Sequence, residues 1–351
     1  MAKFKDTPTI RALAGRLNIS PSTVSLALNG RRPTGFVSAS TRQQVWRAAE
    51  EMGYPIAKLR SRRPLLERVG IFARTHNTVY AASLLELCRV LNERGVEVVI
   101  HSVATERESV GAARDLAGRH EVDGAVFVGS RHSADEVLSA DLLESLPSVY
   151  VGEVHEGAGV WQVRPDNEGG GRAVGQHLLS LGHKNIAALF PPSAQYVARP
   201  RLHGLRAVLE ENGLSLPNEN ILVIDPFSQQ NFDAIITRFM TRNRALPDTE
   251  RVSALFCYND WNAAKALRAL RRIGVQVPDE LSLVGFDNAE FTLLLDPEIT
   301  TVEQPFALMG AMTADLLLEQ TEKRLSGDTA APRVITAPCT LVVRNSVTRT
   351  A

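Results

Sequence analysis

Between residues 69 and 286 the sequence alternates short apolar, β-rich runs with helical patterns. The first series of β-rich runs covers 69–73, 96–101, 124–128 and 148–152, and the second covers 186–190, 221–224, 254–257 and 281–286. The helical patterns between them end at Arg94 and Arg119 in the first series and cover 171–181, 201–212, 232–242 and 261–272 in the second. This alternation predicts parallel sheets with helices on both faces. Two series of similar size predict two doubly wound lobes, with a ligand site where the carboxyl ends of their strands face each other.

Residues 9–30 predict two short helices that meet at a tight polar break. One apolar helical face consists of Ile10, Leu13, Ala14 and Leu17, and the next consists of Val24, Ala27 and Leu28. Asn18 interrupts the first pattern, Ser20 offers an N-cap oxygen, and Pro21 occupies the first helical position, where a missing N–H has no cost. This layout is typical of a helix-turn-helix, in which small polar residues let the second helix approach DNA closely.

A third helix is predicted over residues 41–52, where Ser40 and Gln43 form an S-x-x-Q capping box and Gly53 ends the pattern. Its inward face consists of Val45, Ala48, Ala49 and Met52. Three short helices of this kind can share one small core. The following stretch, residues 55–64, is basic and bounded by prolines, which predicts a linker or hinge.

The charge of the chain is distributed unevenly. The 351 residues include 39 Lys or Arg and 39 Asp or Glu, so the formal net charge is zero. Residues 1–68, however, contain 13 Lys or Arg and only 4 Asp or Glu, a net charge of +9, and the remainder therefore carries −9. A basic head on an acidic body indicates a nucleic-acid-binding domain attached to a second module. The alternative is a solvated basic surface without a partner.

Other bulk properties suit a cytoplasmic protein. The first residues lack the apolar core of a signal peptide, and no apolar run approaches the length that spans a bilayer. Cys88, Cys257 and Cys339 lie far apart, without Cys-x-x-Cys or Cys/His spacing. We therefore expect a reducing compartment, no membrane partner, no disulfide framework and no metal site.

A set of short motifs, in fixed order over about 330 residues, resembles the LacI/GalR family of bacterial transcriptional regulators. In the head these are Thr9-Ile10, Ser22-Thr23-Val24-Ser25, Leu28-Asn29-Gly30, Val37-Ser38, Thr41-Arg42 and Met52-Gly53-Tyr54. In the body they are Val122-Asp123-Gly124, Asp166-Asn167, Gly170-Gly171-Arg172, Leu181-Gly182-His183, Arg201-Leu202-His203-Gly204, Tyr258-Asn259-Asp260, Val284-Gly285-Phe286-Asp287, Thr300-Thr301-Val302 and Leu341-Val342-Val343-Arg344. Each motif alone is weak, but the ordered set is specific.

The resemblance implies an α/β protein with an N-terminal all-α helix-turn-helix head, joined by a hinge to a two-lobed periplasmic-binding-protein-like body of doubly wound parallel sheets. We expect the head at residues 1–54, the hinge at 55–67 and the effector-binding and dimerisation domain at 68–351. Within that domain the N-lobe is expected at about 68–182 and 303–328, and the C-lobe at about 183–302 and 329–351.

The family likeness implies a homodimer in which each recognition helix enters a major groove of double-stranded operator DNA. Pro21, Ser22 and Leu26 then occupy base-reading positions. The residues expected to contact phosphates are Ser20, Thr23, Ser25 and Asn29. Leu26 departs from the family, which often has a polar or basic residue there, and it either contacts a thymine methyl or packs in the head. The loop 31–36 is about three residues longer than usual. In the short hinge Leu59 is the candidate minor-groove wedge, with packing against the body as its alternative.

For the effector cleft, the resemblance points to Arg201, Asn259 and Asp287, with Phe227 and Phe306 as apolar walls. Further candidates are Arg74, His76 and Tyr80 after the first strand, with ordinary loop residues as the alternative. Asp166 either lines the cleft or caps the following helix, and Asp260 is interpreted as a helix cap rather than a ligand contact. An arginine beside an aspartate and an asparagine suits several hydroxyls or a carboxylate.

These features predict a sequence-specific DNA-binding regulator, a repressor, whose operator binding is modulated by a small-molecule effector such as a sugar or related metabolite. An enzyme is the first alternative, but no G-x-S-x-G, H-E-x-x-H or phosphate-loop motif occurs. A transport-type sugar-binding protein is the second, but it would carry a signal peptide and no basic head. We expect no cofactor, and without a leucine-heptad tail after Arg344 we expect a dimer rather than a tetramer.

Overall fold

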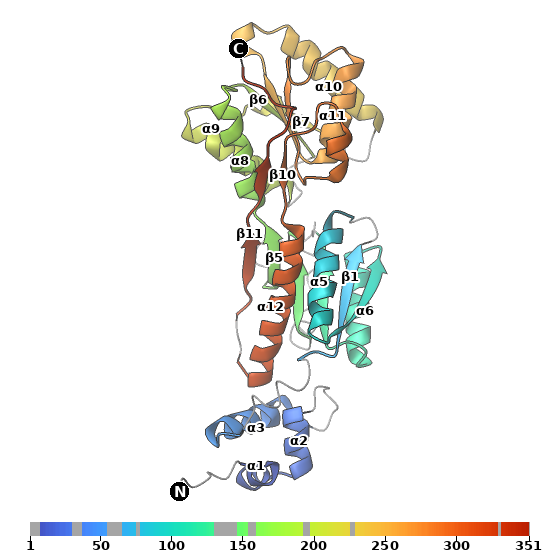
Figure 1. The fold of residues 1–351 in the computed structure, drawn as a ribbon, viewed down its shortest axis with the longest axis vertical. Coiled ribbons are helices and arrows are strands. Elements are labelled where there is room, and N and C mark those ends of the chain that lie inside the picture. The colour runs from blue at the N-terminus through green and yellow to red at the C-terminus, as the bar shows by residue number, and fades with distance from the viewer. Residues whose placement is uncertain are drawn as a thin grey trace.

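A computed structural model describes residues 8–29, 37–54, 65–74, 78–129, 146–153, 159–191, 197–224, 229–328 and 331–350. The described residues form a small helical head and two α/β lobes stacked end to end (Figure 1). This arrangement confirms the predicted fold class of a helical head on a body of doubly wound parallel sheets.

The head consists of α1 (Ile10–Leu17), α2 (Pro21–Asn29) and α3 (Ala39–Glu51). Its core contains the predicted inward faces, with Leu13 and Val24 fully buried against Val45 of the third helix. Asn18 ends α1 in the left-handed conformation, with φ of 52°. Ser20 caps α2 as predicted, since its hydroxyl accepts the backbone N–H of Thr23 at 3.0 Å.

The start of α3 differs from the prediction. Ser38, not Ser40, is the N-cap, and its hydroxyl accepts the backbone N–H of Thr41 at 3.1 Å. The helix therefore begins two residues earlier than predicted, at Ala39. The sequence Ser-Ala-Ser offers two equivalent capping hydroxyls, and local spacing alone does not distinguish them.

Replacing Ser38 by alanine is expected to destabilise α3 by about 1 kcal/mol, because it removes an acceptor for an end N–H that has no partner within the helix. Ser40→Ala is the matched control and should have a smaller effect. Amide hydrogen exchange of residues 41–49 measures the difference. Equal losses of protection in the two variants would restore Ser40 as the cap.

The N-lobe is built on a six-stranded parallel sheet in the order β11-β5-β4-β3-β1-β2. The strands are β1 (Arg68–Arg74), β2 (Glu97–Val103), β3 (Gly124–Val128), β4 (Ser148–Val151), β5 (Trp161–Pro165) and β11 (Val334–Ala337). The helices of this lobe are α5 (Ala81–Glu93), which follows the short 3-10 turn η1 (Thr78–Tyr80), α6 (Glu106–Gly118) and α12 (Phe306–Ser326).

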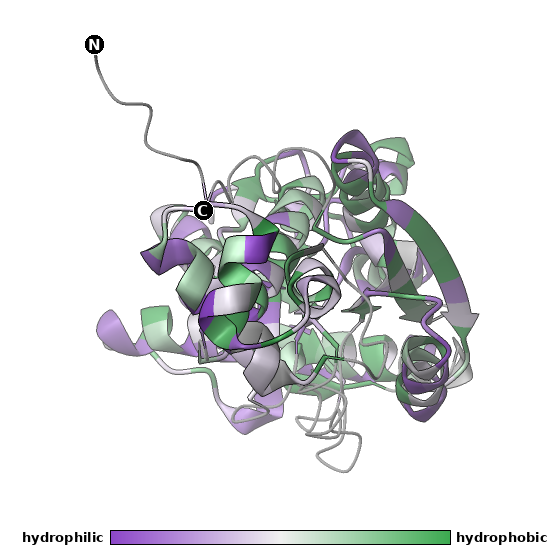
Figure 2. Cartoon of the chain, turned by 90° about the horizontal axis from the view of Figure 1, so that it is seen from below, coloured by the Kyte–Doolittle hydropathy of each residue, from purple (hydrophilic) through white to green (hydrophobic). Residues whose placement is uncertain are grey.

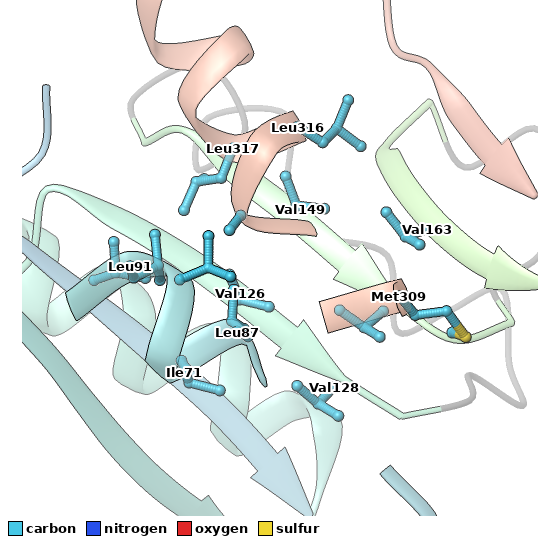
Figure 3. Close-up of a cluster of buried hydrophobic side chains, with 14 of the residues drawn as sticks. Ile71, Leu87, Leu91, Val126, Val128, Val149, Val163, Met309, Leu316 and Leu317 are labelled. Atoms are coloured by element: carbon cyan, nitrogen blue, oxygen red, sulfur yellow. The ribbon is translucent and has the colours of Figure 1, made fainter. Parts of the chain in front are cut away.

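Each face of the N-lobe sheet buries its own set of side chains. On one face Ile71, Val126 and Val149 pack against Leu87 of α5 and Leu317 of α12 (Figure 3). The opposite face, under α6, carries a row of stacked rings in register across four strands, His101, Phe72, Phe127 and Tyr150. Burial on both faces explains why these strands are continuous apolar runs rather than alternating ones.

The C-lobe contains a four-stranded parallel sheet in the order β7-β6-β8-β9. Its strands are β6 (Ile186–Phe190), β7 (Ile221–Val223), β8 (Ala254–Cys257) and β9 (Ser282–Val284). The helices α8 (Asn167–Ser180) and α9 (Ala198–Glu211) share one core with this sheet, and α10 (Gln229–Arg244) and α11 (Asp260–Arg272) share another. Short 3-10 turns lie at η3 (Asn218–Asn220), η4 (Asp248–Glu250) and η5 (Glu290–Leu294).

The chain crosses between the lobes near an antiparallel pair formed by β10 (Thr301–Glu303) and β12 (Thr340–Val342) (Figure 1). Two predicted boundaries are wrong. The N-lobe is expected to continue to residue 182, but α8 packs in the core of the C-lobe. The prediction also places 329–351 entirely in the C-lobe. Residues 334–337 form β11, which pairs with β5 at the edge of the N-lobe sheet. A four-residue strand that pairs with a segment about 170 positions away leaves no local signal in the sequence.

Viewed from the side of the head, hydrophilic and hydrophobic segments alternate along the helices (Figure 2). This alternation is typical of helices that bury one face. None of the helices within the described ranges combines the length and the apolar character needed to cross a bilayer.

Candidate functional site

The candidate site is organised around the buried side chain of Arg201, on α9 of the C-lobe. Its Nε donates to the Asn167 side-chain oxygen at 2.8 Å, and one terminal nitrogen donates to the backbone oxygen of Tyr258 at 2.6 Å. The other terminal nitrogen lies 3.4 Å from Oδ1 of Asp287. The guanidinium carbon lies 3.7 Å from the centre of the Phe286 ring, so the cation is held by hydrogen bonds and by an aromatic face.

Glycines bring Arg201 to this position by allowing α8 and α9 to approach closely. A Cβ atom at Gly171 of α8 would lie 2.0 Å from the backbone oxygen of Arg201. A Cβ atom at Gly204 of α9 would lie 2.1 Å from the backbone oxygen of Glu168. Both distances are far below van der Waals contact with rigid backbone atoms. The backbone at the start of α9 therefore rests directly on the glycine face of α8.

Two buried carboxyl groups lie in the same network as Arg201. Asn167 donates from its side-chain nitrogen to Glu153 at 2.8 Å, and Gln304 donates to Asp287 at 2.6 Å. Burial raises the pKa of Asp287, although Arg201 and Gln304 act in the opposite direction. Burial likewise raises the pKa of Glu153, and the Asn167 hydrogen bond opposes that shift. Arg201 therefore lies near two acids that burial disfavours as anions, and Arg164, 3.7 Å from Glu153, is a second cation beside the network.

A groove of about 760 Å³ reaches this network from the surface. Asp287 and Gln304 line it together with Phe306, and both lobes contribute to its walls. Phe306 packs edge-on against Tyr80, with ring centres 5.4 Å apart. The described part of the site thus combines polar hydrogen-bonding groups with an aromatic wall, a combination typical of small-molecule sites.

The structure brings several of the predicted effector residues together. Arg201 and Asp287 are adjacent, Tyr80 pairs with Phe306, and Asp287 and Phe306 line the same groove. Asp166 is the N-cap of α8, since its carboxylate accepts the N–H of Gly169 at 2.8 Å, in agreement with one of its two predicted roles. His76, Phe227 and the side chain of Arg74 lie outside the described residues.

The helix-cap interpretation of Asp260 is wrong, and the cap belongs to Asn259. The side-chain oxygen of Asn259 accepts the N–H of Asn262 at 2.9 Å at the start of α11. Asp260 is the first residue of that helix and is fully buried, where it bonds Thr301 and the backbone of Ala289. Both residues can supply a capping oxygen, and the tertiary contacts with residues 289 and 301 decide between them.

Sequence reasoning missed three side chains that complete the network, Asn167, Glu153 and Gln304. Asn167 belongs to a family motif but was not assigned a contact. Glu153 follows β4 by two residues, where the carboxyl end of a central parallel strand should have pointed to it. Gln304 follows β10, a short strand for which the sequence has no periodic signal.

In the head, the predicted DNA-reading residues lie at the start and on the outer side of α2. Pro21 and Ser22 are exposed, and Leu26 is 40% exposed and absent from the apolar core of the head. Ser20 accepts the N–H of Thr23, and its oxygen also lies 2.7 Å from the hydroxyl of Ser22. Ser25 is half-buried. The side chain of Asn29 and all of Leu59 and of the loop 31–36 lie outside the described residues.

Residues 175–347 match the family model described as a periplasmic binding protein-like domain. The HTH-type transcriptional regulator CelR of Thermobifida fusca is 31% identical over 97% of this chain and 98% of its own. DegA of Bacillus subtilis, an HTH-type transcriptional regulator, is 28% identical over 96% and 97%. These relatives are named as regulators, which agrees with the prediction that the chain is not an enzyme.

Solved structures repeat the fold over the whole chain. A transcriptional regulator CelR–cellobiose complex is 29% identical, with a TM-score of 0.66, over 97% of this chain and 99% of that one. A lac repressor dimer bound to operator and the anti-inducer ONPF is 22% identical, with a TM-score of 0.66, over 98% of this chain and all of the other, and shows the fold alone. The similarity to CelR is 31% identity and extends over nearly the whole length of both chains. It shows that the chain is a member of the LacI/GalR family of transcriptional regulators.

Proposed function

We propose that the protein is a cytoplasmic repressor that binds operator DNA as a homodimer, and that a neutral sugar held between the lobes modulates this binding. The observation that carries the proposal is the state of Arg201. Three of its nitrogens are already engaged by Asn167, Tyr258 and Asp287, and two buried carboxyl groups flank it. A guanidinium in this setting has little capacity left for a second anion.

The Arg201–Asp287 contact, at 3.4 Å, is the longest bond of the network. A sugar hydroxyl inserted there could donate to the carboxylate and accept from the guanidinium at the same time, because a hydroxyl is both donor and acceptor. A carboxylate or phosphate could only accept, and it would face Asp287 and Glu153. Hydroxyls are therefore favoured over the carboxylate that the sequence left open.

The complexes of similar proteins support this ligand class and this partner. One structure, 29% identical, holds cellobiose, and a lac repressor dimer holds operator and ONPF. On the proposed model, ligand binding changes lobe closure and the spacing of the two heads. Because such coupling is reciprocal, operator DNA must change sugar affinity by the same factor.

The test is a thermal-shift and calorimetric comparison of cellobiose and ribose with gluconate and glucose 6-phosphate. We expect a stabilising shift with a neutral sugar and none with the anions. DNA affinity for a duplex selected from a randomised pool is then measured with and without that sugar. Binding of the anions alone would contradict the proposed ligand class, and unchanged DNA affinity would contradict the switch.

Leu26 provides a test of the reading helix. Because it is exposed and outside the head core, Leu26→Ala should leave stability nearly unchanged but weaken binding to the selected duplex about tenfold, near the low end of about 1–3 kcal/mol for a lost base contact. The control is Val24→Ala, a fully buried truncation expected to cost about 0.5–3 kcal/mol of stability. Parental DNA affinity in Leu26→Ala would remove it from the proposed interface.

For the remaining head residues the proposal keeps the predicted roles. Pro21 and Ser22 face the bases, and Ser20, Thr23, Ser25 and Asn29 hold phosphates. Leu59 is the proposed minor-groove wedge, and Leu59→Ala should reduce operator bending in a circular-permutation assay. Bending equal to that of the parent would exclude this role.

Exposed apolar side chains on both lobes of the body support the homodimer. Leu294 is 86% exposed, Leu85 of α5 70% and Trp261 of α11 61%, and Trp261 stacks on Phe291 with ring centres 4.5 Å apart. Leu308 of α12, Trp261 and Phe291 line the groove that also contains Asp287 and Gln304, whereas Leu294 and Leu85 lie outside it. Apolar groups gathered in this way on both lobes are typical of a surface that another chain covers.

Leu294→Glu is expected to weaken dimerisation by about 10- to 100-fold, because a charge would enter a desolvated contact worth about 1–3 kcal/mol. Leu26→Glu, an equally apolar-to-acidic change in the head, is the control. Sedimentation velocity over a concentration series measures the dissociation constant. An unchanged constant for Leu294→Glu would place the dimer surface elsewhere.

A further inference from the structure

The turn formed by residues 287–291 lines the groove of the candidate site, together with the exposed side chain of Trp261. At its start Asp287 contacts Arg201 and Gln304. At its end Phe291 stacks on Trp261, whose indole is largely exposed. Five residues therefore connect the Asp287 carboxylate with the aromatic contact between Phe291 and Trp261 in the same groove.

The backbone of this turn is strained at two successive positions. Asp287 has φ of 111° and Asn288 has φ of 53°, both in the region that side chains other than glycine rarely adopt. Conformations of this kind cost about 1–3 kcal/mol each and persist only where the surroundings hold them. The contacts that hold the turn are therefore the ones that decide whether it keeps this shape.

The carboxylate of Asp260 is the centre of those contacts. One of its oxygens accepts the N–H of Ala289 at 2.7 Å, and the other accepts the hydroxyl of Thr301 at 2.6 Å. The Thr301 hydroxyl in turn accepts the N–H of Asn288 at 3.3 Å. At Gly285 a Cβ atom would lie 2.1 Å from the Asp260 oxygen, so the absence of a side chain there makes room for the carboxylate.

Arg344 holds the turn from the other side. Its guanidinium donates to the Asn288 side chain at 2.5 Å and to the Thr292 hydroxyl at 2.9 Å. These bonds hold the side chains of Asn288 and of Thr292, which directly follows the turn. The strained backbone N–H groups of residues 288 and 289 are bonded through Thr301 and Asp260.

We propose that Asp260 is a positioning residue that keeps the 287–291 turn in its strained conformation and thereby links the ligand-facing Asp287 to the aromatic contact between Phe291 and Trp261. This inference rests on the proposed function, since it assigns the route by which a sugar bound at Asp287 affects the contact between Phe291 and Trp261. If Ala289 leaves Asp260, the turn can relax to ordinary φ values. Asp287 then withdraws from Arg201 while Phe291 moves relative to Trp261, so the two contacts change together.

The environment of Asp260 also predicts which substitution preserves the role. Burial raises its pKa to about 7, with Asp287 adding to the shift and the hydrogen bonds from Thr301 and Ala289 opposing it. The neutral acid is therefore compatible with the site. Asparagine resembles that form, because its oxygen can accept from Ala289 while its NH₂ donates to the Thr301 hydroxyl. Alanine offers neither group.

The test uses the full-length protein with Trp46→Phe and Trp161→Phe, which leaves Trp261 as the single tryptophan. We expect Asp260→Ala to shift the Trp261 emission and to weaken cellobiose binding about tenfold, and Asp260→Asn to restore both. Asp260→Leu is similar in size but cannot accept a hydrogen bond, so it should shift the emission as Asp260→Ala does. A side chain that merely filled space would be replaced by leucine without a shift.

Two adjacent buried threonines supply a second variant and its control. Thr301→Val removes the hydroxyl that bonds Asp260 and Asn288 and should shift the Trp261 emission in the same direction as Asp260→Ala. Thr300→Val removes a buried hydroxyl that accepts the N–H of Arg344 at 2.9 Å, and it should leave the emission as in the parent. If Asp260→Ala does not fold, this threonine pair decides the question.

The inference is overturned if Thr301→Val, or a folded Asp260→Ala, has the emission of the parent, or if Thr300→Val shifts it equally. Failure of the parent to bind cellobiose would count against that sugar in the proposed function. It would leave the emission of Trp261, which needs no ligand, to decide the role of Asp260.

Discussion

Arg201→Ala is expected to abolish effector binding and to lower the free energy of unfolding by about 3–5 kcal/mol, the range for a buried ion pair that loses one partner. The physical reason is that Asp287 would lose its cationic partner, and the side-chain oxygen of Asn167 and the backbone oxygen of Tyr258 would lose their donor. Urea unfolding measures the stability, and calorimetry with the sugar selected by thermal shift measures the binding.

Two further substitutions test whether the effect is specific to Arg201 or would follow from the loss of any arginine on α9. Arg206, on the same helix, donates to Asn218 at 3.4 Å near the surface, and Arg206→Ala should change stability by no more than about 0.5 kcal/mol. Arg201→Lys keeps the charge but not the planar fork that reaches Asn167, Tyr258 and Asp287 together, so it should not restore binding. Full binding by the lysine variant would show that effector binding needs only the positive charge of Arg201 and not the geometry of its guanidinium.

Gly171→Ala is expected to destabilise the C-lobe by about 1–3 kcal/mol and to weaken effector binding, because overpacking forces backbone shifts of this cost. The added Cβ would lie 2.0 Å from the backbone oxygen of Arg201, so α9 must move away from α8 and carry the guanidinium with it. Urea unfolding and calorimetry measure the two effects.

Gly111→Ala is the control for this substitution. Gly111 lies inside α6, and a Cβ there meets nothing within 4 Å. The substitution should stabilise the protein by about 0.5–1 kcal/mol, since alanine is the better helix former. If Gly171→Ala behaved like Gly111→Ala, the close contact of α8 with α9 would not be what positions Arg201.

Much of the fold could be predicted from the sequence because its strands are buried on both faces. The runs at 124–128, 186–190 and 254–257 were placed at the positions observed for β3, β6 and β8. Strands β5, β10, β11 and β12 were missed. They have only three to five residues, too few for a period to mark them. The partners of β10, β11 and β12 also lie far away in the chain.

The candidate site was predicted less completely, for a related reason. The family resemblance supplied Arg201 and Asp287, which the structure places 3.4 Å apart. The resemblance could not show which of Asn259 and Asp260 caps α11, because either side chain can supply a capping oxygen. In the folded protein the Asp260 carboxylate accepts hydrogen bonds from Ala289 and Thr301, and it therefore does not cap the helix.

The sequence by itself determined the helical head, the two series of parallel strands and the membership of the family, because periodicity and ordered motifs are local properties of a chain. The tertiary structure alone decided which lobe holds residues 334–337 and which side chains complete the bonding of Arg201. It also showed that Asp260 supports the strained turn. These contacts join residues that are distant in sequence, and their energy depends on burial, which a linear pattern does not contain.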